Sequence, residues 1–522
     1  MTDKVISLQI KPGIQRDGTL FDAPTYVDGS WVRFQRGRPR KIGGYKGIFL
    51  NGSGVSRGMT MTSQNGLNYV VSGYNNGLEQ WQTDNDDGVG SGPYPYTLTN
   101  FTANNNNLWQ FDIGYDTNGT TQTLVAHPGQ NLANIDSTTT TPVLYGNFPG
   151  SSLSAVKDTS GANPTGATIA VSGGCVILHP YLFVYGDHGL IQNSSAGNFQ
   201  DWNSADSNSN NVATGKIVKG LPVRGGTTSP AGLFWALDAL VRVTFTGSAP
   251  FYWRYDLISS QTSIMSSSCV IEYDGIYFWC GVDRFLMYNG VVQEMPNNMN
   301  QNWFFDNLNY VQRQKVWATK VPRFGEIWWF YPRGDATECN DAIIYNVREQ
   351  TWYDAGQALG ARRSAGTFSE VFRKPIWGGN EANSQGKYTN WQHETGTDSI
   401  YLTNVDAVDS YFETNNIGLV TGGPGANEVV GANRWLRVIR VEPDFVQSGS
   451  MNLFVTGKGY ADDVDVTTGP YSYQPNTLKI DLREQRREMR LRFESNTAGG
   501  DYQMGKVLML VEAGDERSTA SP

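Results

Sequence analysis

Apolar and polar residues along this chain form a kernel that recurs about every fifty residues. Each copy has an apolar, aromatic-rich strand, a turn containing Gly or Asp, and a second strand that ends on an aromatic or aliphatic residue. Hairpins repeated with a period of about 40–50 residues are typical of a β-propeller, in which each repeat forms one blade. Clear copies span residues 68–81, 181–202, 275–290 and 326–354, and weaker copies span 123–135, 233–245 and 375–391.

The pattern predicts an all-β fold: a β-propeller of about six or seven blades with an N-terminal extended arm and a C-terminal β-sandwich-like domain. Composition agrees with this fold class. The 522 residues are 39% hydrophobic and include 59 glycines, which supply the tight turns between short strands. Apolar residues at helical spacing are sparse, and residues 306–316 are the best candidate for a short helix.

The character of the chain changes near each end. After residue 409, apolar and polar residues alternate as in half-buried antiparallel strands, with a spacing that no longer matches the kernel. These strands form a separate small β-domain, or some of them complete the last blade. The polar tracts 83–107 and 201–213 are predicted to be exposed loops. The predicted segments are an arm and first strand (1–50), a propeller (51–408), a C-terminal β-domain (409–514) and a disordered tail (515–522).

Charge and cysteine content narrow the possible functions. A net charge of −9 argues against a broad basic surface that grips nucleic acid, but it allows a channel through which nucleic acid slides. The four cysteines lack metal-ligand spacing and are expected to be buried free thiols of a protein made in a reducing compartment. The N-terminus lacks the apolar region of a signal peptide, and no stretch is long enough for a membrane span. We therefore expect a soluble protein without a membrane span.

Catalytic and metal-binding motifs are weak. His188 follows Asp187 in a GDHG turn, where a solvated histidine is a better interpretation than a general base. No Ser lies in a GxSxG nucleophile elbow, which needs a strand–turn–helix context, and no HExxH or P-loop motif occurs. The tract 84–87 has the carboxylates for calcium but not the spacing of an EF-hand, which favours a solvated loop. We expect no catalytic residue, cofactor or metal, although a propeller glycosidase would draw its acids from turn residues. The candidates are Asp238, Asp274, Asp283, Asp335 and Asp341.

Residues 31–49 concentrate cations among aromatic residues and glycines. Such a segment can contact phosphates or an acidic surface of a protein partner. For an acidic protein that associates with its own copies, a protein partner is the better interpretation. The residues expected to contact a partner or DNA are Trp31, Arg33, Arg36, Arg38, Arg40 and Lys41.

Both ends of the chain resemble a known family. The similarity is carried by IKPGIQRDGTLFDAPTYVDGSWVRFQRGRPRKIGGYKGI (residues 10–48) and RLRFESNTAGGDYQMGKVLMLVEAGDER (residues 490–517). They look like the tail nozzle or hub family of short-tailed bacteriophages, also called packaged-DNA stabilisation proteins. The resemblance implies a non-enzymatic virion protein, made in the host cytoplasm, that is built around a β-propeller and forms a homohexameric ring in the tail at the portal vertex.

The resemblance also implies the partners. The ring would lie below the adaptor protein, enclose the exit channel for double-stranded DNA, retain packaged DNA, open at DNA ejection, and hold a tail fibre or spike. The family offers no motif that would locate the residues of the gate. The alternative is a tail-associated glycan-binding or depolymerising β-propeller. In that case Trp279, Trp328, Trp329 and Trp377 would stack on sugars, although their strand context favours the blade core.

Overall fold

The computed structural model describes residues 4–20, 24–99, 101–102, 108–116, 122–129, 138–160, 166–223, 230–418, 435–460 and 463–514. Over these residues the protein is all-β and propeller-like. Its helical content there is one short helix, α1 (Gln301–Asn307), and three 3-10 turns, η1 (Asp187–Gly189), η2 (Tyr310–Lys315) and η3 (Leu359–Ala361). The predicted helix over 306–316 thus corresponds to the end of α1 followed by η2.

The middle of the chain forms successive antiparallel sheets, each built on four strands that follow one another like a meander. Six of the seven kernels contain the central hairpin of a sheet, which confirms these six as structural repeats. The kernel predicted at 123–135 contains only the strand Gln122–His127, and its residues 130–135 lie outside the described residues. The first four sheets comprise β8 (Gly58–Gln64), β9 (Leu67–Tyr74), β10 (Gly77–Thr83) and β11 (Ser91–Pro95); β13 (Gln110–Tyr115), β14 (Gln122–His127), β16 (Leu144–Phe148) and β17 (Ser152–Ala155), extended by β12 (Thr97–Leu98); β21 (Gly174–Leu178), β22 (Tyr181–Tyr185), β23 (Leu190–Asn193) and β24 (Asn208–Asn211); and β25 (Ile217–Pro222), β26 (Ala231–Ala236), β27 (Leu240–Ser248) and β28 (Phe251–Ser259).

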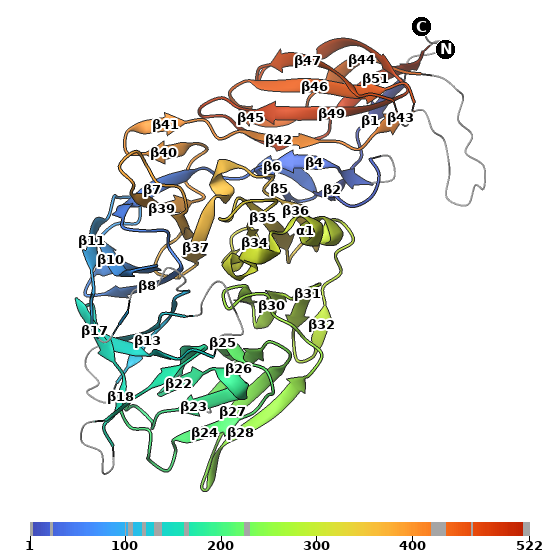
Figure 1. The fold of residues 1–522 in the computed structure, drawn as a ribbon. Coiled ribbons are helices and arrows are strands. Elements are labelled where there is room, and N and C mark those ends of the chain that lie inside the picture. Colours follow the sequence, from blue (N-terminus) through green and yellow to red (C-terminus); the bar gives the residue numbers. More distant parts are fainter. Residues whose placement is uncertain are drawn as a thin grey trace.

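Three further sheets continue the series. The first strand of each sheet contacts the first strand of a neighbouring sheet, and Figure 1 shows the sheets arranged around a common centre. These sheets comprise β29 (Val270–Tyr273), β30 (Ile276–Cys280), β31 (Phe285–Tyr288) and β32 (Val292–Glu294); β33 (Trp317–Val321), β34 (Glu326–Tyr331), β35 (Asp341–Asn346) and β36 (Thr351–Asp354); and β37 (Arg363–Thr367), β38 (Ile376–Gly379), β39 (Tyr388–His393), β7 (Tyr45–Gly52), β40 (Ser399–Tyr401) and β41 (Asn404–Asp406).

The last of these sheets joins residues from both ends of the series. Strand β7 comes before the first sheet in sequence, yet it pairs antiparallel with β39, with His393 opposite Tyr45. Because β37 also contacts β8, the last sheet lies against the first and the series closes on itself. Strand β7, at the junction of the segments predicted as arm (1–50) and propeller (51–408), therefore completes the seventh sheet.

The C-terminal β-domain contains the N-terminal strands as well. Its sheets lie beside the ring of seven sheets, and both chain ends lie at its far side (Figure 1). One sheet has the order β1 (Lys4–Ser7), β51 (Leu508–Ala513), β44 (Leu436–Glu442), β48 (Ile480–Arg486). A second sheet has the order β4 (Asp28–Ser30), β42 (Ser410–Glu413), β49 (Glu488–Ser495), β46 (Met451–Lys458), β47 (Val466–Tyr473), and β43 (Ile417–Gly418) also pairs with β49. A third sheet has the order β45 (Phe445–Ser448), β50 (Asp501–Met504), β6 (Arg38–Lys41), β5 (Val32–Gln35), and β2 (Lys11–Ile14) pairs with β3 (Thr25–Tyr26).

The predicted extended arm is not confirmed, because the N-terminal segment is folded into this domain. Its apolar side chains Tyr26, Trp31, Val32 and Phe34 are buried in the same cluster as residues of β44, β46 and β49. Burying that much apolar and aromatic surface favours a docked segment over a free arm. The predicted tail, 515–522, lies outside the described residues.

Tryptophans fill the interior of the sheets. Trp279 and Trp329 are buried in one cluster, and Trp328 and Trp377 in the cluster shared with the C-terminal β-domain. They are therefore core residues and are not available to stack on a sugar. The four cysteines, Cys175, Cys269, Cys280 and Cys339, are buried free thiols, as predicted.

Candidate functional site

The residues predicted to contact a partner divide into two groups. Trp31, Arg33 and Lys41 are buried inside the chain. Arg36 is exposed, and Arg38 and Arg40 are partly exposed. The contact prediction thus stays a prediction for the three arginines that reach solvent, whereas the polar groups of the three buried residues are bound within the chain.

Arg33 is the centre of that contact. Its Nε and Nη2 donate to the two carboxylate oxygens of Glu326 on β34, at 2.8 and 3.0 Å, and its Nη1 and Nη2 donate to Glu394 at 2.9 and 2.6 Å. The ring of Phe324 lies 3.7 Å from the guanidinium carbon. Burial alone lowers the pKa of Arg33, but the charges of Glu326 and Glu394 raise it above its usual value. The guanidinium therefore stays charged and fully paired.

Lys41 is held by the C-terminal β-domain. Its Nζ donates to the backbone carbonyl of Gly500 at 2.7 Å. Burial lowers the pKa of Lys41, against the opposing effect of nearby carboxylates led by Asp398. Trp31 Nε1 donates to the carbonyl of Gly43 at 3.1 Å. These polar groups are satisfied within the chain, which is the pattern of structural residues rather than of a docking surface.

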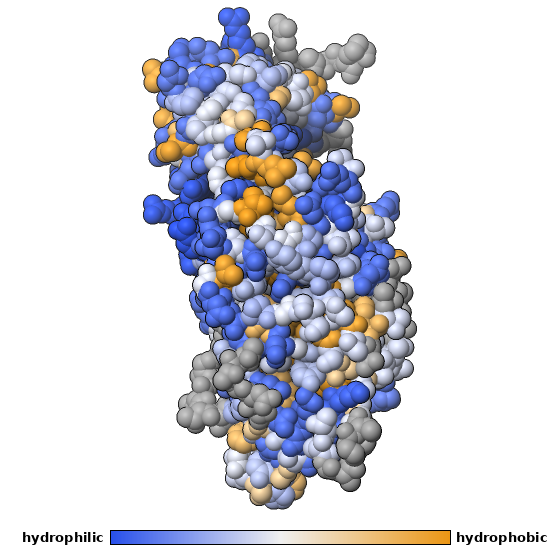
Figure 2. Space-filling model, turned by 90° about the vertical axis from the view of Figure 1, so that its left-hand side faces the viewer, coloured by the Kyte–Doolittle hydropathy of each residue, from blue (hydrophilic) through white to orange (hydrophobic). Residues whose placement is uncertain are grey.

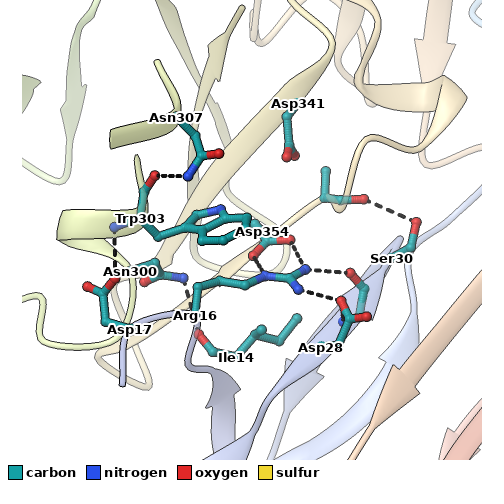
Figure 3. Close-up of polar contacts among 12 residues, drawn as sticks. Ile14, Arg16, Asp17, Asp28, Ser30, Asn300, Trp303, Asn307, Asp341 and Asp354 are labelled. Carbon is teal, nitrogen blue, oxygen red and sulfur yellow. Dashed lines mark hydrogen bonds and ion pairs between the residues drawn. The ribbon is translucent and has the colours of Figure 1, made fainter. Parts of the chain in front are cut away.

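A second charge cluster connects β2, β4 and the sixth sheet (Figure 3). Arg16 donates through Nε and Nη2 to Asp354 at 2.8 and 2.9 Å, and also pairs with Asp28. Asp17, next to it, accepts hydrogen bonds from the backbone N–H groups of Asn302 and Trp303 in the first turn of α1. Sequence reasoning missed this cluster. The only local signal of the cluster in the sequence is the charged pair Arg16 and Asp17, because most partners of this pair are distant in sequence.

One predicted acid belongs to the same region. Asp341 is buried on β35 and pairs with Arg333 at 3.0 Å. Burial and then the charge of Asp354 raise the pKa of Asp341 to about 6, against the attraction of Arg333. The other candidate acids lie in turns of the fourth, fifth and sixth sheets, where Asp238 accepts from Thr214 and Asp283 pairs with Arg284. The structure does not bring the five acids together as a catalytic pair.

The remaining polar candidates also have ordinary surroundings. The side chain of His188 is 80% exposed and lies 3.0 Å from Asp187, as expected for a solvated turn. Asp86 and Asp87 face the cations of Arg373 and Lys374. No group of three or more His, Cys, Asp or Glu side chains that could hold a metal ion occurs in the described part of the chain.

A cavity of about 200 Å³ lies at the centre of the ring. Residues on or next to the first strands of six of the seven sheets line it, namely β8, β13, β25, β29, β33 and β37. Its volume is below the range of about 300–1,000 Å³ that is usual for pockets of drug-sized ligands. The cavity is therefore suited to a small ion or a few waters.

Comparisons with known proteins give only distant similarity. No family model matches the chain, and no curated protein matches it. Among solved structures, the computationally designed Ika8 protein is 11% identical over 73% of this chain and 99% of its own, with a TM-score of 0.35. Exo-β-1,3-galactanase from Phanerochaete chrysosporium is 10% identical over 90% and 100%, with a TM-score of 0.26. Trypanosoma rangeli sialidase is 10% identical over 98% and 96%, with a TM-score of 0.30. Values this low do not establish a shared fold or function.

Among the described residues, none of the helices is both long and apolar enough to cross a membrane.

Proposed function

We propose that this chain is a structural virion protein that forms the nozzle ring of a short phage tail. In this proposal the subunit is a seven-bladed β-propeller fused to a C-terminal β-domain, and copies of it enclose the DNA exit channel below the adaptor protein. The support for seven blades is the order of the sheets, with β7 pairing to β39 so that one sheet combines strands from both ends of the series. A closed ring of sheets leaves few exposed edges.

The observation that carries the proposal is the pair of apolar surfaces that the chain leaves exposed. One is the hairpin β40–β41, where Leu402 is 57% and Val405 is 53% exposed. Figure 2 shows hydrophobic residues gathered on this face, at the level of that hairpin. The other is on the C-terminal β-domain, where Leu478 is 86% exposed beside a groove that Phe445 and Leu508 also line. Two different patches on one subunit are what a head-to-tail ring requires.

The channel for DNA would lie between the copies. The cavity inside one subunit holds about 200 Å³, which is a sphere only about 7 Å across, whereas the major groove of DNA alone is about 12 Å wide. A duplex therefore passes outside each propeller, through the hole of the ring. Arg36, Arg38 and Arg40 are the sequence-predicted cations that remain available for phosphates or for a neighbouring subunit.

The two buried charge clusters suit a subunit that bears mechanical load. Arg33 and Arg16 each join an N-terminal segment to the sixth sheet through paired carboxylates. A movement of the C-terminal β-domain, for instance when a fibre or spike engages a receptor, would therefore be transmitted to the ring of sheets. In the proposed mechanism such a movement opens a constriction that retains the DNA end.

The mass and symmetry of the particle test this proposal. Multi-angle light scattering and negative-stain class averages of the full chain are expected to give six-fold rings with a central hole. A trimer or monomer at micromolar concentration would overturn the nozzle assignment. For the gate, averages of tails before and after DNA ejection are expected to differ in pore width, and a uniformly wide pore in both states would remove that part of the mechanism.

A second candidate function is glycan binding, and one groove favours it. A pocket of about 440 Å³ lies between the edge strands β24 and β28. It combines amide side chains with aromatic rings, and Phe251 in it is 77% exposed. Aromatic rings with a few polar groups are a common lining for ligands that have apolar and hydroxylated faces. Glycan-array binding that Phe251→Ala abolishes would favour this candidate. The pocket between β24 and β28 is lined by Ala205, Ser207, Asn208, Asn210, Asn211, Val212, Pro250, Phe251, Tyr252, Trp253 and Tyr255.

A further inference from the structure

The cavity at the centre of the ring has a basic wall that is drawn from three different sheets. Arg57 precedes β8, Lys219 lies on β25, and Lys315 precedes β33. These residues are separated by more than 90 positions in sequence, so their convergence is a product of the fold. In a protein with a net charge of −9, three cations around one small cavity are an unusual concentration of positive charge.

Two of the cations share one carboxylate. Arg57 donates through Nη1 and Nη2 to the two oxygens of Glu338, at 2.8 and 2.6 Å, and Lys315 Nζ donates to the same carboxylate at 2.9 Å. One negative charge thus faces two positive charges. Lys315 Nζ also donates to the backbone carbonyl of Thr337 at 2.6 Å. The Nε of Arg57 has no hydrogen-bond partner among the described residues, but it is buried and is not accessible to a guest. What the pair offers the cavity is therefore its surplus positive charge.

Lys219 is the third cation, and within the described structure no hydrogen bond or ion pair reaches its ammonium group. The largest charge effect on Lys219 comes from Asp112, whose carboxylate accepts from the backbone N–H groups of Ile113 and Ile177 at 2.8 and 2.7 Å. Burial lowers the pKa of Lys219, and the charge of Asp112 only partly opposes this effect. Lys219 is only partly exposed, and a partly desolvated ammonium without a direct partner is stabilised when an anion approaches it.

The rest of the lining fits a small polar guest. Ser268 is partly exposed and adds a hydroxyl, while Trp109 and Trp317 form apolar walls whose indole N–H groups are already bound to backbone carbonyls. Lys219 is itself partly exposed, so the cavity is reached by solvent. The volume of about 200 Å³ admits a tetrahedral ion but not a sugar ring with its substituents.

We propose that this cavity binds one small oxyanion, with phosphate as its chemical class, through Lys219 and the surplus positive charge of Arg57 and Lys315. The ion completes the charge balance of the basic wall and ties three sheets together at the centre of the ring. This site goes beyond the proposed nozzle function and does not depend on it, because it needs only the closed ring of sheets.

Titration of the full chain with sodium phosphate, at constant ionic strength against sodium chloride, tests the proposal by calorimetry. We expect one saturable site per chain, and at least tenfold weaker binding by Lys219→Met. Lys11→Met is the matched control, because Lys11 is an exposed lysine on β2, and it is expected to bind like the wild type. Absence of a saturable site in the wild type, or unchanged binding by Lys219→Met, would overturn the proposal.

A second variant guards against misfolding. Ser268→Asp keeps all three cations and adds a negative charge at the cavity wall, so it is expected to abolish phosphate binding with an unchanged circular dichroism spectrum. Retained binding by Ser268→Asp would also overturn the proposal. The ligand could be a free phosphate ion or the phosphate group of a larger molecule, and titrations with inorganic phosphate and with phenyl phosphate distinguish the two. Tighter binding of the former indicates a free ion, and tighter binding of the latter indicates the phosphate group of a larger molecule.

Discussion

Arg33 and Glu326 form a doubly hydrogen-bonded ion pair that is fully buried between an N-terminal strand and the sixth sheet of the ring. The two contacts measure 2.8 and 3.0 Å, and Tyr353 and Trp328 donate to the same carboxylate. Burial raises the pKa of Glu326, and Arg33 is the main influence that counteracts this rise. The guanidinium thus compensates a charge that would otherwise be buried alone.

Arg33→Met is expected to destabilise the protein by about 3–5 kcal/mol, because it leaves Glu326 and Glu394 without their cation. Urea unfolding followed by tryptophan fluorescence measures the loss. Arg36→Met is the control: its side chain is exposed on the same hairpin, and its effect should stay within about 0.5 kcal/mol. Equal effects of the two substitutions would show that the buried pair does not stabilise this contact.

The pH dependence of stability has a defined sign at His127. This imidazole is buried, accepts from the N–H of Gly129 through Nδ1 at 3.0 Å, and has Nε2 within 3.1 Å of the carbonyl of Val171. Burial lowers its pKa from 6.5 to about 4. The unfolded chain therefore binds a proton more readily than the folded chain. The contribution of neutral His127 to the free energy of unfolding is complete above pH about 6.5 and decreases as the pH falls toward 4.

Between pH 6.5 and 5 this difference is worth up to about 2 kcal/mol, at about 1.36 kcal/mol for each pH unit. His127→Gln should be less stable than the wild type at pH 7 but should lose this slope. Asp341 acts in the opposite direction, because its raised pKa makes the folded state the better proton binder between pH 4 and 6. The free energy of unfolding is therefore measured for wild type and His127→Gln at each pH. If the two curves of free energy against pH run parallel, His127 is not the source of the slope.

The pairing of β7 with β39 makes the seventh sheet depend on a strand from the N-terminal region. Phe49 on β7 is buried, with its ring 6.1 Å from Trp81 and 6.2 Å from Phe372. Phe49→Ala should cost about 3–5 kcal/mol and open the ring locally. Hydrogen exchange should then rise in β38, β39 and β9 but not in β26. Leu359→Ala is the control, since Leu359 is largely exposed. Uniform exchange over all sheets would argue against a closing strand.

The sequence predicts the repeating part of this fold well, because a kernel such as 275–290 contains both strands and the turn of one hairpin. Long-range pairing is not encoded in that way. Arg33 meets Glu326 across 293 positions, and Arg16 meets Asp354 across 338. From the local pattern, a basic segment with aromatic residues is equally compatible with a free arm and with a docked one. The burial of Trp31 and Phe34 decides between them.

The basic cavity was missed for the same reason. Arg57, Lys219 and Lys315 each lie at the start of a different sheet, where a single cation beside an apolar strand carries no signal. Only the closure of the ring places them around one volume. In contrast, the absence of HExxH and P-loop motifs could be read directly, because each of those depends on residues close in sequence. The GxSxG pattern at residues 54–58 lies between β7 and β8 with no helix after it, so it does not form a nucleophile elbow.

The apolar surface of the β40–β41 hairpin gives the last prediction. Leu402 and Val405 are largely exposed at a tight turn, where Leu402 has a positive φ of 55°. If this hairpin contacts the next copy, Leu402→Lys with Val405→Lys places two cations in an apolar interface and should convert the assembly to monomers, as measured by light scattering. Leu359→Lys removes an equally exposed leucine that is not on the hairpin, and should leave the mass unchanged. Because all three side chains are exposed in the single chain, the monomer should keep its melting temperature in every variant. Loss of assembly in Leu359→Lys as well would indicate a general effect of surface charge, and an intact ring in the hairpin variant would place the subunit contact elsewhere.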